Sequence, residues 1–320
     1  MPVNADKPDR WKADIARSVD FFNDWFMQFA PKAYRDTRVE ATRQVEIALA
    51  RTGKLTNIEP VVLQQNPSVL PILRMATAPP IARDRLVGLA GVSPNLVKNM
   101  EIDERMPPRM SRTALHAELR QIADMIMRLV DKDIFPWLED GHQPSQTEVH
   151  RAATIVADRL CGAQADPIIR NAQERRQLAT IREWLEQRNY SYVKPGEGAT
   201  FDNLRPGTFA FRMNVPVKLQ SGQKEVNIPV DTAIMPHEAE SGELPLLVEA
   251  KSAGDFTNTN KRRKEEAQKI AQLRSTYGDK VVYILFLCGY FDSGYLGYEA
   301  AEGIDWVWEH RIDDLAAFGV

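Results

Sequence analysis

The chain has 320 residues, of which 43% are hydrophobic and 27% are charged, and its formal net charge is -3. This composition is typical of a soluble globular protein, and the length allows one large domain or two ordinary ones, of which we predict two. A net charge near zero gives no overall attraction to nucleic acid, so such a partner would have to be held by a local basic patch.

No segment has the pattern of a membrane span, a signal peptide or a zinc site. The longest apolar run, residues 281–288, is far too short to cross a bilayer, and the first six residues lack the apolar core of a signal peptide. We therefore expect a cytoplasmic protein. Cys161 and Cys288 are expected to be buried thiols, and the five histidines are too scattered for a zinc site.

Residues 1–162 are predicted to form an all-helical domain. Apolar residues recur at helical spacing in four segments, which proline-rich connections separate. The four segments are 11–29, 33–50, 114–130 and 147–160.

Within this domain, residues 81–100 have the pattern of a helix-turn-helix. Gly91 would form the turn. The apolar positions between the two helices would be filled by Leu86, Ala90, Val92, Val97 and Met100. Helical hairpins with a glycine turn are also common in domains that never touch DNA, so the pattern leaves both a DNA-binding role and a purely structural role open.

Residues 163–320 are predicted to form a second domain, which begins with a helix over 166–188. Leu178, Ile181 and Leu185 define its inward stripe at helical spacing, and Glu174 precedes Leu178 by four residues. We therefore expect Glu174 to face inward. It is either one partner of a structural ion pair or a third carboxylate of the catalytic site described below.

Three strands are predicted next, over 208–215, 226–235 and 246–251, and they form an antiparallel meander. A helix that stops at Gly278 follows, and then an apolar strand that begins at Val281. A strand, helix, strand crossover of this kind favours parallel pairing at the sheet centre. The fold class is therefore α+β, with a helical region followed by a mixed sheet flanked by helices.

The second and third of these strands carry Asp231, Glu249 and Lys251. Side chains two residues apart on a strand share a face, so Glu249 and Lys251 point the same way, and a neighbouring strand with Asp231 would complete a compact site. Carboxylates are hard oxygen ligands for Mg²⁺, and a lysine beside a phosphate could position or help deprotonate an attacking water. Glu-x-Lys is more often a solvated strand edge, but the preceding apolar residues 246–248 indicate an interior strand.

A basic run, Lys261-Arg262-Arg263-Lys264, lies ten residues beyond Lys251. Such a run is usually a solvated helix start. Four cations in the first turn of a helix oppose its dipole, however, and a phosphate partner would explain that conflict.

The order of elements, with an acidic residue on one strand and Glu-x-Lys on the next, resembles the PD-(D/E)xK nuclease superfamily. The proline is displaced in this chain, as Pro229-Val230-Asp231. A closer and longer resemblance is to the XamI-like family of type II restriction endonucleases. It is carried by residues 166–174, 249–266 and 303–311.

The resemblance implies a homodimeric, Mg²⁺-dependent enzyme that cuts double-stranded DNA at a short palindrome, with GTCGAC as the expected site. A DNA methyltransferase would be its genetic rather than physical partner. Asp231, Glu249 and the Ala250 carbonyl would hold the metal, and Lys251 would orient the attacking water. The residues expected to contact bases or phosphates are Asn258, Asn260, Lys261, Arg262, Arg263 and Lys264.

Two other interpretations are also compatible with the sequence. One is a non-catalytic regulator whose helix-turn-helix binds DNA, for which the charges of Asp231, Glu249 and Lys251 would be dispensable. The other is a nuclease of the same fold that recognises a repair intermediate or a junction by its shape.

Overall fold

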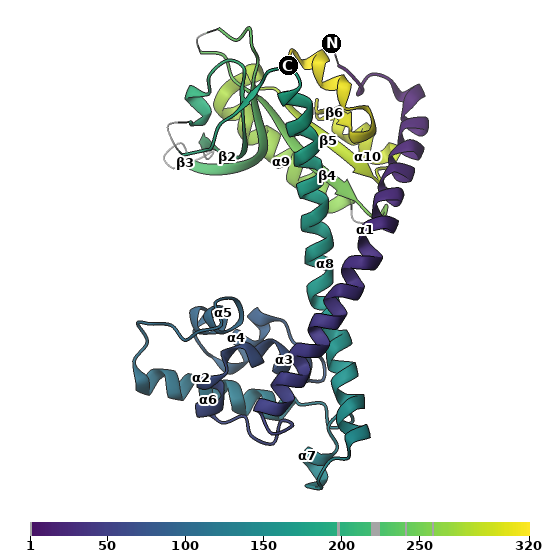
Figure 1. Ribbon diagram of the computed structural model, residues 1–320. Coiled ribbons are helices and arrows are strands. Elements are labelled where there is room, and N and C mark those ends of the chain that lie inside the picture. The colour runs from purple at the N-terminus through teal and green to yellow at the C-terminus, as the bar shows by residue number, and fades with distance from the viewer. Residues whose placement is uncertain (1, 197–198, 219–224, 241, 258) are drawn as a thin grey trace. The chain divides into compact units, whose positions relative to one another are not determined.

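The computed structural model describes residues 2–196, 199–218, 225–240, 242–257 and 259–320, and for 259–262 it describes the backbone alone (Figure 1). The chain divides into two compact units, each with its own core. One unit comprises Met1–Phe29 and Arg170–Val320, and the other comprises Ala30–Ile169.

The unit of residues 30–169 is entirely helical in its regular structure, apart from one isolated bridge between Thr77 and Val130. It contains the second part of α1 (Pro8–Arg51) and the first part of α8 (Gln146–Glu186). Its other elements are α2 (Pro60–Gln65), η1 (Pro67–Val69), α3 (Leu70–Met75), α4 (Arg83–Ala90), α5 (Pro94–Ile102), α6 (Arg112–Leu129) and α7 (Trp137–Asp140). Apolar residues from all the longer helices form one continuous core.

α1 and α8 are each one continuous helix, whereas the sequence pattern predicted a break in both. The expected breaks lay at Pro31 and near Pro167, and both prolines lie inside the observed helices. A proline removes one hydrogen bond and crowds the preceding turn, a local cost that burial on either side can outweigh. Ala30 and Ala41 are buried around the first proline, and Ala165 is fully buried before the second.

The predicted pair of helices around Gly91 is present, as α4 and α5. Gly91 has φ 66° and ψ 36°, the left-handed conformation that ends a helix, and its N–H donates to the Val87 carbonyl at 3.0 Å. All five apolar residues expected between the helices are buried.

The other unit is built on a six-stranded sheet with the strand order β1-β2-β3-β4-β5-β6. The strands are β1 (Ser191–Tyr192), β2 (Thr208–Lys218), β3 (Glu225–Met235), β4 (Leu246–Ala253), β5 (Tyr283–Gly289) and β6 (Asp305–Trp308). The remaining elements are η2 (Phe201–Asn203), α9 (Thr259–Tyr277), η3 (Gly278–Lys280), α10 (Ser293–Ala301) and η4 (Glu309–Phe318). The predicted α+β class is confirmed, because β2, β3 and β4 pair antiparallel, and β4 pairs parallel with β5.

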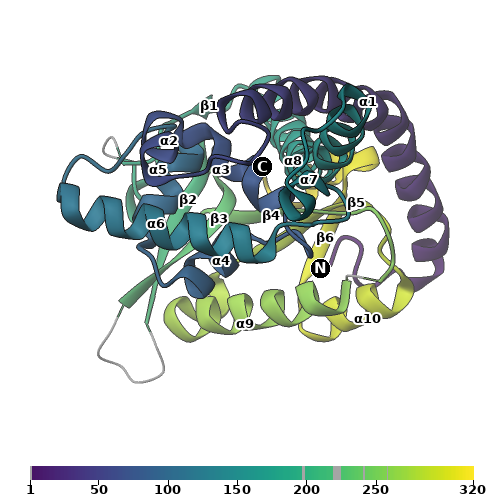
Figure 2. The same cartoon turned by 90° about the horizontal axis from the view of Figure 1, so that it is seen from below.

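Helices cover both faces of this sheet (Figures 1 and 2). α9 and α10 pack on one face through residues such as Leu273 and Leu296, together with Leu285 of β5. The end of α8 and η4 pack on the other face, where Ile181 meets Phe286. Both faces of β5 are buried, as expected of a central strand with parallel neighbours.

The first 29 residues pack on the sheet unit, whereas the expected domain limits, 1–162 and 163–320, placed them with the helical part. Asn4 donates a side-chain hydrogen bond to the Trp306 carbonyl at 2.8 Å, and the Trp11 and Trp306 rings meet edge to face at 5.5 Å. The Gly289 N–H donates to the Ser18 hydroxyl at 2.8 Å. These contacts join the start of α1 to β5 and β6.

The cysteines and the apolar character of the helices were both considered from composition. Cys161 and Cys288 are both buried and free, as predicted, and burial raises the pKa of Cys288 well above its usual value. Across the described residues, none of the helices has both the length and the apolar character needed to cross a membrane.

Candidate active site

The site lies where two neighbouring strands separate. β3 pairs with β4 only from Thr232–Val248 to Ile234–Leu246, whereas β4 continues beside β5 as far as Ala253. The first residues beyond the last pair are Asp231 on β3 and Glu249 on β4. The separation therefore opens the sheet next to two carboxylates.

A side-chain hydrogen bond replaces the sheet ladder at this point. The Ala250 N–H donates to Asp231 Oδ2 at 2.9 Å. On the side of β5, the Leu247 N–H donates to the Val282 carbonyl, and the Ala253 carbonyl accepts from the Tyr290 N–H. Backbone groups of successive residues in a strand point to opposite sides, so the N–H and carbonyl of Ala250 point to the side that β3 leaves. The Ala250 carbonyl is thereby directed toward the same opening as Asp231.

Glu249 and Lys251 share the face of β4 that α9 covers. Lys251 Nζ donates to Glu249 Oε1 at 3.0 Å, and the side chains are 22% and 9% exposed. The structure thus brings together the three residues that the sequence singled out, Asp231, Glu249 and Lys251.

Two further charged residues reach the same point from α9, and sequence reasoning missed both. Lys269 Nζ lies 2.8 Å from Glu249 Oε2 and donates to the Pro229 carbonyl at 2.9 Å. Glu266 Oε1 lies 3.8 Å from Lys251 Nζ. Glu266 and Lys269 precede Ile270 and Leu273 by four residues, so the inward stripe of this helix already contained the signal.

A second layer of polar groups supports this network. On the α10 side, Tyr295 donates to Glu266 Oε2 at 2.6 Å, and the neighbouring Glu299 is completely buried. On the α8 side, Gln177 Nε2 donates to the Lys251 carbonyl at 3.4 Å and to the Phe286 carbonyl at 3.3 Å. The strand that carries Glu249 and Lys251 is therefore fixed from both faces.

Burial and charge shift the proton equilibria of the central residues. Burial, and then the carboxylate of Glu249, raise the pKa of Asp231 to about 6. Burial alone would lower the pKa of Lys251, but Glu249, Glu266 and Asp231 outweigh it, so that pKa is raised. Burial, and then Glu266, raise the pKa of Glu299 to about 9. Lys251 is thus held as a cation, and Glu299 is neutral at pH 7.

The donor set at this opening fits a small divalent cation. Glu249 Oε2 is buried and accepts no hydrogen bond from the described residues, although Lys269 neutralises it. Asp231 and the Ala250 carbonyl face the same opening. No cage of three or more His, Cys, Asp or Glu side chains occurs in the part of the chain that the structure describes. Mg²⁺ needs no such cage, because it commonly takes one or two carboxylates and completes its shell with water and phosphate oxygens.

Glu174 does not face inward as expected. Its side chain is 39% exposed and pairs with Arg212 at 2.8 Å, whereas Gln173 and Gln177 are buried. These two glutamines lie four residues apart on the buried side of α8, and Glu174 is turned about 100° from Gln173 around the helix. The ion pair with Arg212 agrees with the structural alternative for Glu174.

The predicted DNA-contacting segment is described only in part. Asn258 lies outside the described residues, and Asn260, Lys261 and Arg262 are described without their side chains. Arg263 packs its guanidinium 4.1 Å from the centre of the Tyr298 ring on α10, which engages it within the protein. Lys264 is exposed.

Comparison with known proteins identifies the family. The model of the XamI restriction endonuclease family matches residues 53–308, which is most of the chain. The chain belongs to this family. It is also 55% identical over 317 residues to the type II restriction enzyme SalI of Streptomyces albus G, an alignment that covers 99% of each protein. The crystal structure of protein VC1899 from Vibrio cholerae aligns with 87% of this chain and 55% of that one, at 11% identity and a TM-score of 0.28, which is too low to bear on the fold.

Membership in a restriction endonuclease family makes DNA the substrate, and enzymes of this class use divalent metal ions. The family match covers Asp231, Glu249 and Lys251, which lie within residues 53–308.

Proposed function

We propose that this protein is a type II restriction endonuclease that hydrolyses both strands of DNA at a short palindrome, with Mg²⁺ as its metal and GTCGAC as its site. The observation that carries the catalytic assignment is the opening between β3 and β4, with Asp231, Glu249 and the Ala250 carbonyl at its edge. The near full-length likeness to a type II restriction enzyme supports the reaction class.

The residues of the opening have distinct tasks in this proposal. Asp231, Glu249 and the Ala250 carbonyl would hold Mg²⁺, which supplies positive charge at the scissile phosphate and favours deprotonation of the attacking water. Without a metal, the neighbouring carboxylates hold Lys251 as a cation, and as a cation it would orient the water and offset charge on the phosphate. The products would carry 5′-phosphate and 3′-hydroxyl ends.

Lys269 has a positioning task. It lies 2.8 Å from Glu249 Oε2 and balances the charge of that carboxylate. A cation in the opening would compete with Lys269 for Glu249, so the lysine would release the oxygen when metal and DNA enter together.

A palindrome suits a homodimer. Two identical subunits related by a twofold axis would present the same opening to each strand, and each subunit would cut one strand. A cognate methyltransferase that marks the same sequence would protect the host DNA.

Plasmid digestion tests the proposal. A plasmid with one GTCGAC site and a matched plasmid without it are incubated with the protein in Mg²⁺ or in EDTA. We expect linear DNA only from the first plasmid and only with Mg²⁺. The Glu249→Gln variant, which keeps the side-chain shape but loses a ligand charge, should leave the plasmid uncut.

Other results would contradict parts of this proposal. Discrete fragments from a different sequence would overturn GTCGAC alone. Nicking or smearing of both plasmids would favour a nuclease that recognises DNA shape. DNA binding without any cleavage in Mg²⁺ would favour a regulator, and full activity of Glu249→Gln would remove that residue from the site.

A further inference from the structure

The helical unit contains a cleft with unmatched positive charge. It has a volume of about 660 Å³ and lies between α5 and the start of α6. Its charged lining consists of Lys98, Arg105 and Arg109 against the single carboxylate of Asp103. All three cations are exposed. The cleft therefore has the charge of a site for an anion.

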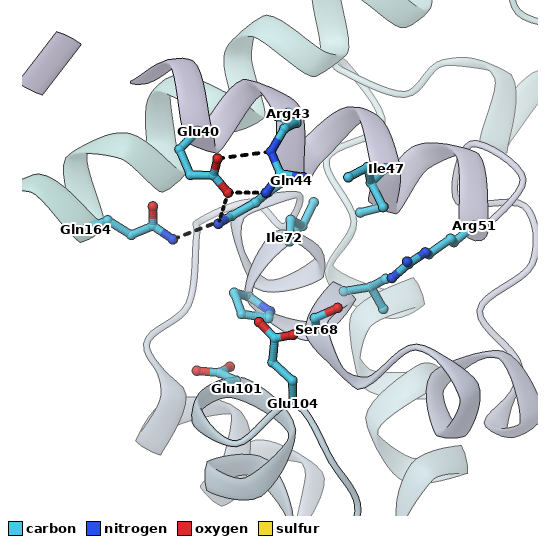
Figure 3. A pocket seen from close by; sticks show the side chains of 13 residues that line it. Glu40, Arg43, Gln44, Ile47, Arg51, Ser68, Ile72, Glu101, Glu104 and Gln164 are labelled. Carbon is cyan, nitrogen blue, oxygen red and sulfur yellow. Dashed lines mark hydrogen bonds and ion pairs between the residues drawn. The ribbon is translucent and has the colours of Figure 1, made fainter. Parts of the chain in front are cut away.

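A second cavity in the same unit has a lining of the opposite kind, in which acidic residues outnumber basic ones. This pocket, of about 290 Å³, is lined by three glutamates and two arginines (Figure 3). Within the lining, Glu40 holds Arg43 at 2.5 Å, and Glu101 pairs at 2.5 Å with Arg74, which lies outside the lining. The acids of this pocket therefore equal or outnumber its cations. In the part of the chain that the structure describes, no ion pair includes Lys98, Arg105 or Arg109. Of these two cavities, the cleft beside α5 is the one that offers several cations without acidic partners.

Amide groups lie beside these cations. Asn99 is 8% exposed, and its Nδ2 donates to the Asn95 carbonyl at 2.8 Å and to Asn95 Oδ1 at 3.0 Å. This pairing fixes Asn95, which is exposed in the first turn of α5. Ser111, at the start of α6, adds a hydroxyl to the lining. The cleft thus combines cations with donors that are held in place.

We propose that this cleft is a second DNA-binding site, which holds the phosphate backbone of the duplex substrate through Lys98, Arg105 and Arg109. A phosphodiester backbone presents a row of negative charges, and three separated cations match a row better than they match one small anion. The cleft is formed by the second helix of the α4–Gly91–α5 pair, the element that enters the major groove in helix-turn-helix proteins. With the helix placed in this way, Asn95 near its start faces the major groove of the DNA.

Binding measured separately from cleavage tests this site. Cognate and unrelated duplexes are titrated with protein in Ca²⁺ over a salt series, and Lys98→Ala, Arg105→Ala and Arg109→Ala are compared with the unmodified protein. Each phosphate contact contributes about 0.9 to the slope of log K against log salt, so each variant should lower the slope by about that amount on both duplexes.

Two controls make the result specific. Arg128 is exposed on the last turn of α6, away from the cleft, so Arg128→Ala should keep the slope of the unmodified protein. Arg105→Lys keeps the charge and should restore most of the slope lost in Arg105→Ala. Unchanged slopes in all three alanine variants, or an equal loss in Arg128→Ala, would overturn the proposal. The proposed nuclease centre is not altered in any of these variants, so their cleavage in saturating DNA reports on that centre independently.

Discussion

At the scale of single residues, the burial of the carboxyl group of Asp231, a proposed metal ligand, lowers the stability of the metal-free protein. Its pKa of about 6, raised by burial and then by Glu249, lies above the ordinary aspartate value of 3.8. The folded protein therefore binds more protons than the unfolded chain between these pH values, and its stability falls as pH rises through that window.

Asp231→Asn should remove this cost. Asparagine keeps an oxygen that can accept from the Ala250 N–H but carries no charge. In EDTA at pH 7, we expect the variant to be more stable than the unmodified protein by about 2 to 3 kcal/mol, because each pKa unit corresponds to about 1.4 kcal/mol. Urea unfolding at pH 4 and pH 7 measures this. The gain should nearly vanish at pH 4, and a gain of equal size at both pH values would exclude titration of Asp231 as its cause.

Glu299 gives a second pH-dependent prediction, in a different window. Burial, and then Glu266, raise its pKa from 4.5 to about 9, so ionisation of Glu299 destabilises the folded protein as pH rises between these values. Glu299→Gln imitates the neutral acid. Its melting temperature should match that of the unmodified protein most closely at about pH 4, below the unfolded-state pKa, and exceed it increasingly up to pH 9, as measured by calorimetry. A constant difference across this range would contradict the assignment.

The central residues could be predicted from sequence because their pattern is local. Glu249 and Lys251 are two charges in an apolar strand, and Asp231 lies on the preceding strand. Lys269 and Glu266 were not predicted, because α9 has so many charged residues that its sequence does not readily show which side of the helix is buried. Glu174 was expected to face inward because Leu178 follows it by four residues, but sequence cannot tell the centre of a buried stripe from its edge.

At the scale of elements, the α4–α5 pair offers two glycines with opposite expected effects. Gly91 has φ 66° at the turn, and a Cβ there would meet nothing within 4 Å, so only the backbone opposes a larger residue. Gly88 lies inside α4, and a Cβ added there would also meet open space. Conformation, rather than packing, therefore decides the outcome at both positions.

Gly91→Ala should destabilise the protein by about 1 kcal/mol, since the left-handed conformation costs an L-residue about that much. Gly88→Ala should stabilise it by about 0.5 to 1 kcal/mol, because alanine loses less entropy in a helix. Thermal unfolding of both variants side by side measures the two shifts. Destabilisation by Gly88→Ala, or no effect of Gly91→Ala, would show that this pair of helices is not formed as described.

Elements were predicted well where one pattern continues without interruption, and less well at prolines. The three antiparallel strands and the crossover to β5 were predicted correctly, because each strand has an uninterrupted pattern and turn residues separate one strand from the next. The continuous α1 and α8 could not be foreseen, because a proline ends most helices and only the packing around Pro31 and Pro167 shows that it does not do so here.

At the scale of the whole molecule, the sheet unit is completed by the two ends of the chain. Asn4 bonds to Trp306 and Asp314, and Arg311 bonds to Asp14 at 2.8 Å. These partners are about 300 residues apart, and no pattern in one sequence reveals such a pairing. The strand that carries Trp306 therefore depends on a segment that the sequence placed in another domain.

The last prediction concerns how the proposed dimer divides the cleavage of the two strands between its subunits. If each subunit cuts one strand, a dimer with one intact centre can only nick a plasmid at its single site. Unmodified protein is mixed with a tenfold excess of Glu249→Gln, allowed to exchange subunits, and added with Mg²⁺ to the plasmid. The first product on an agarose gel should be nicked circles, and linear DNA should appear slowly. The same amount of unmodified protein alone should give linear DNA directly. Direct linearisation by the mixture, once exchange has been verified with a tagged subunit, would show that one subunit cuts both strands.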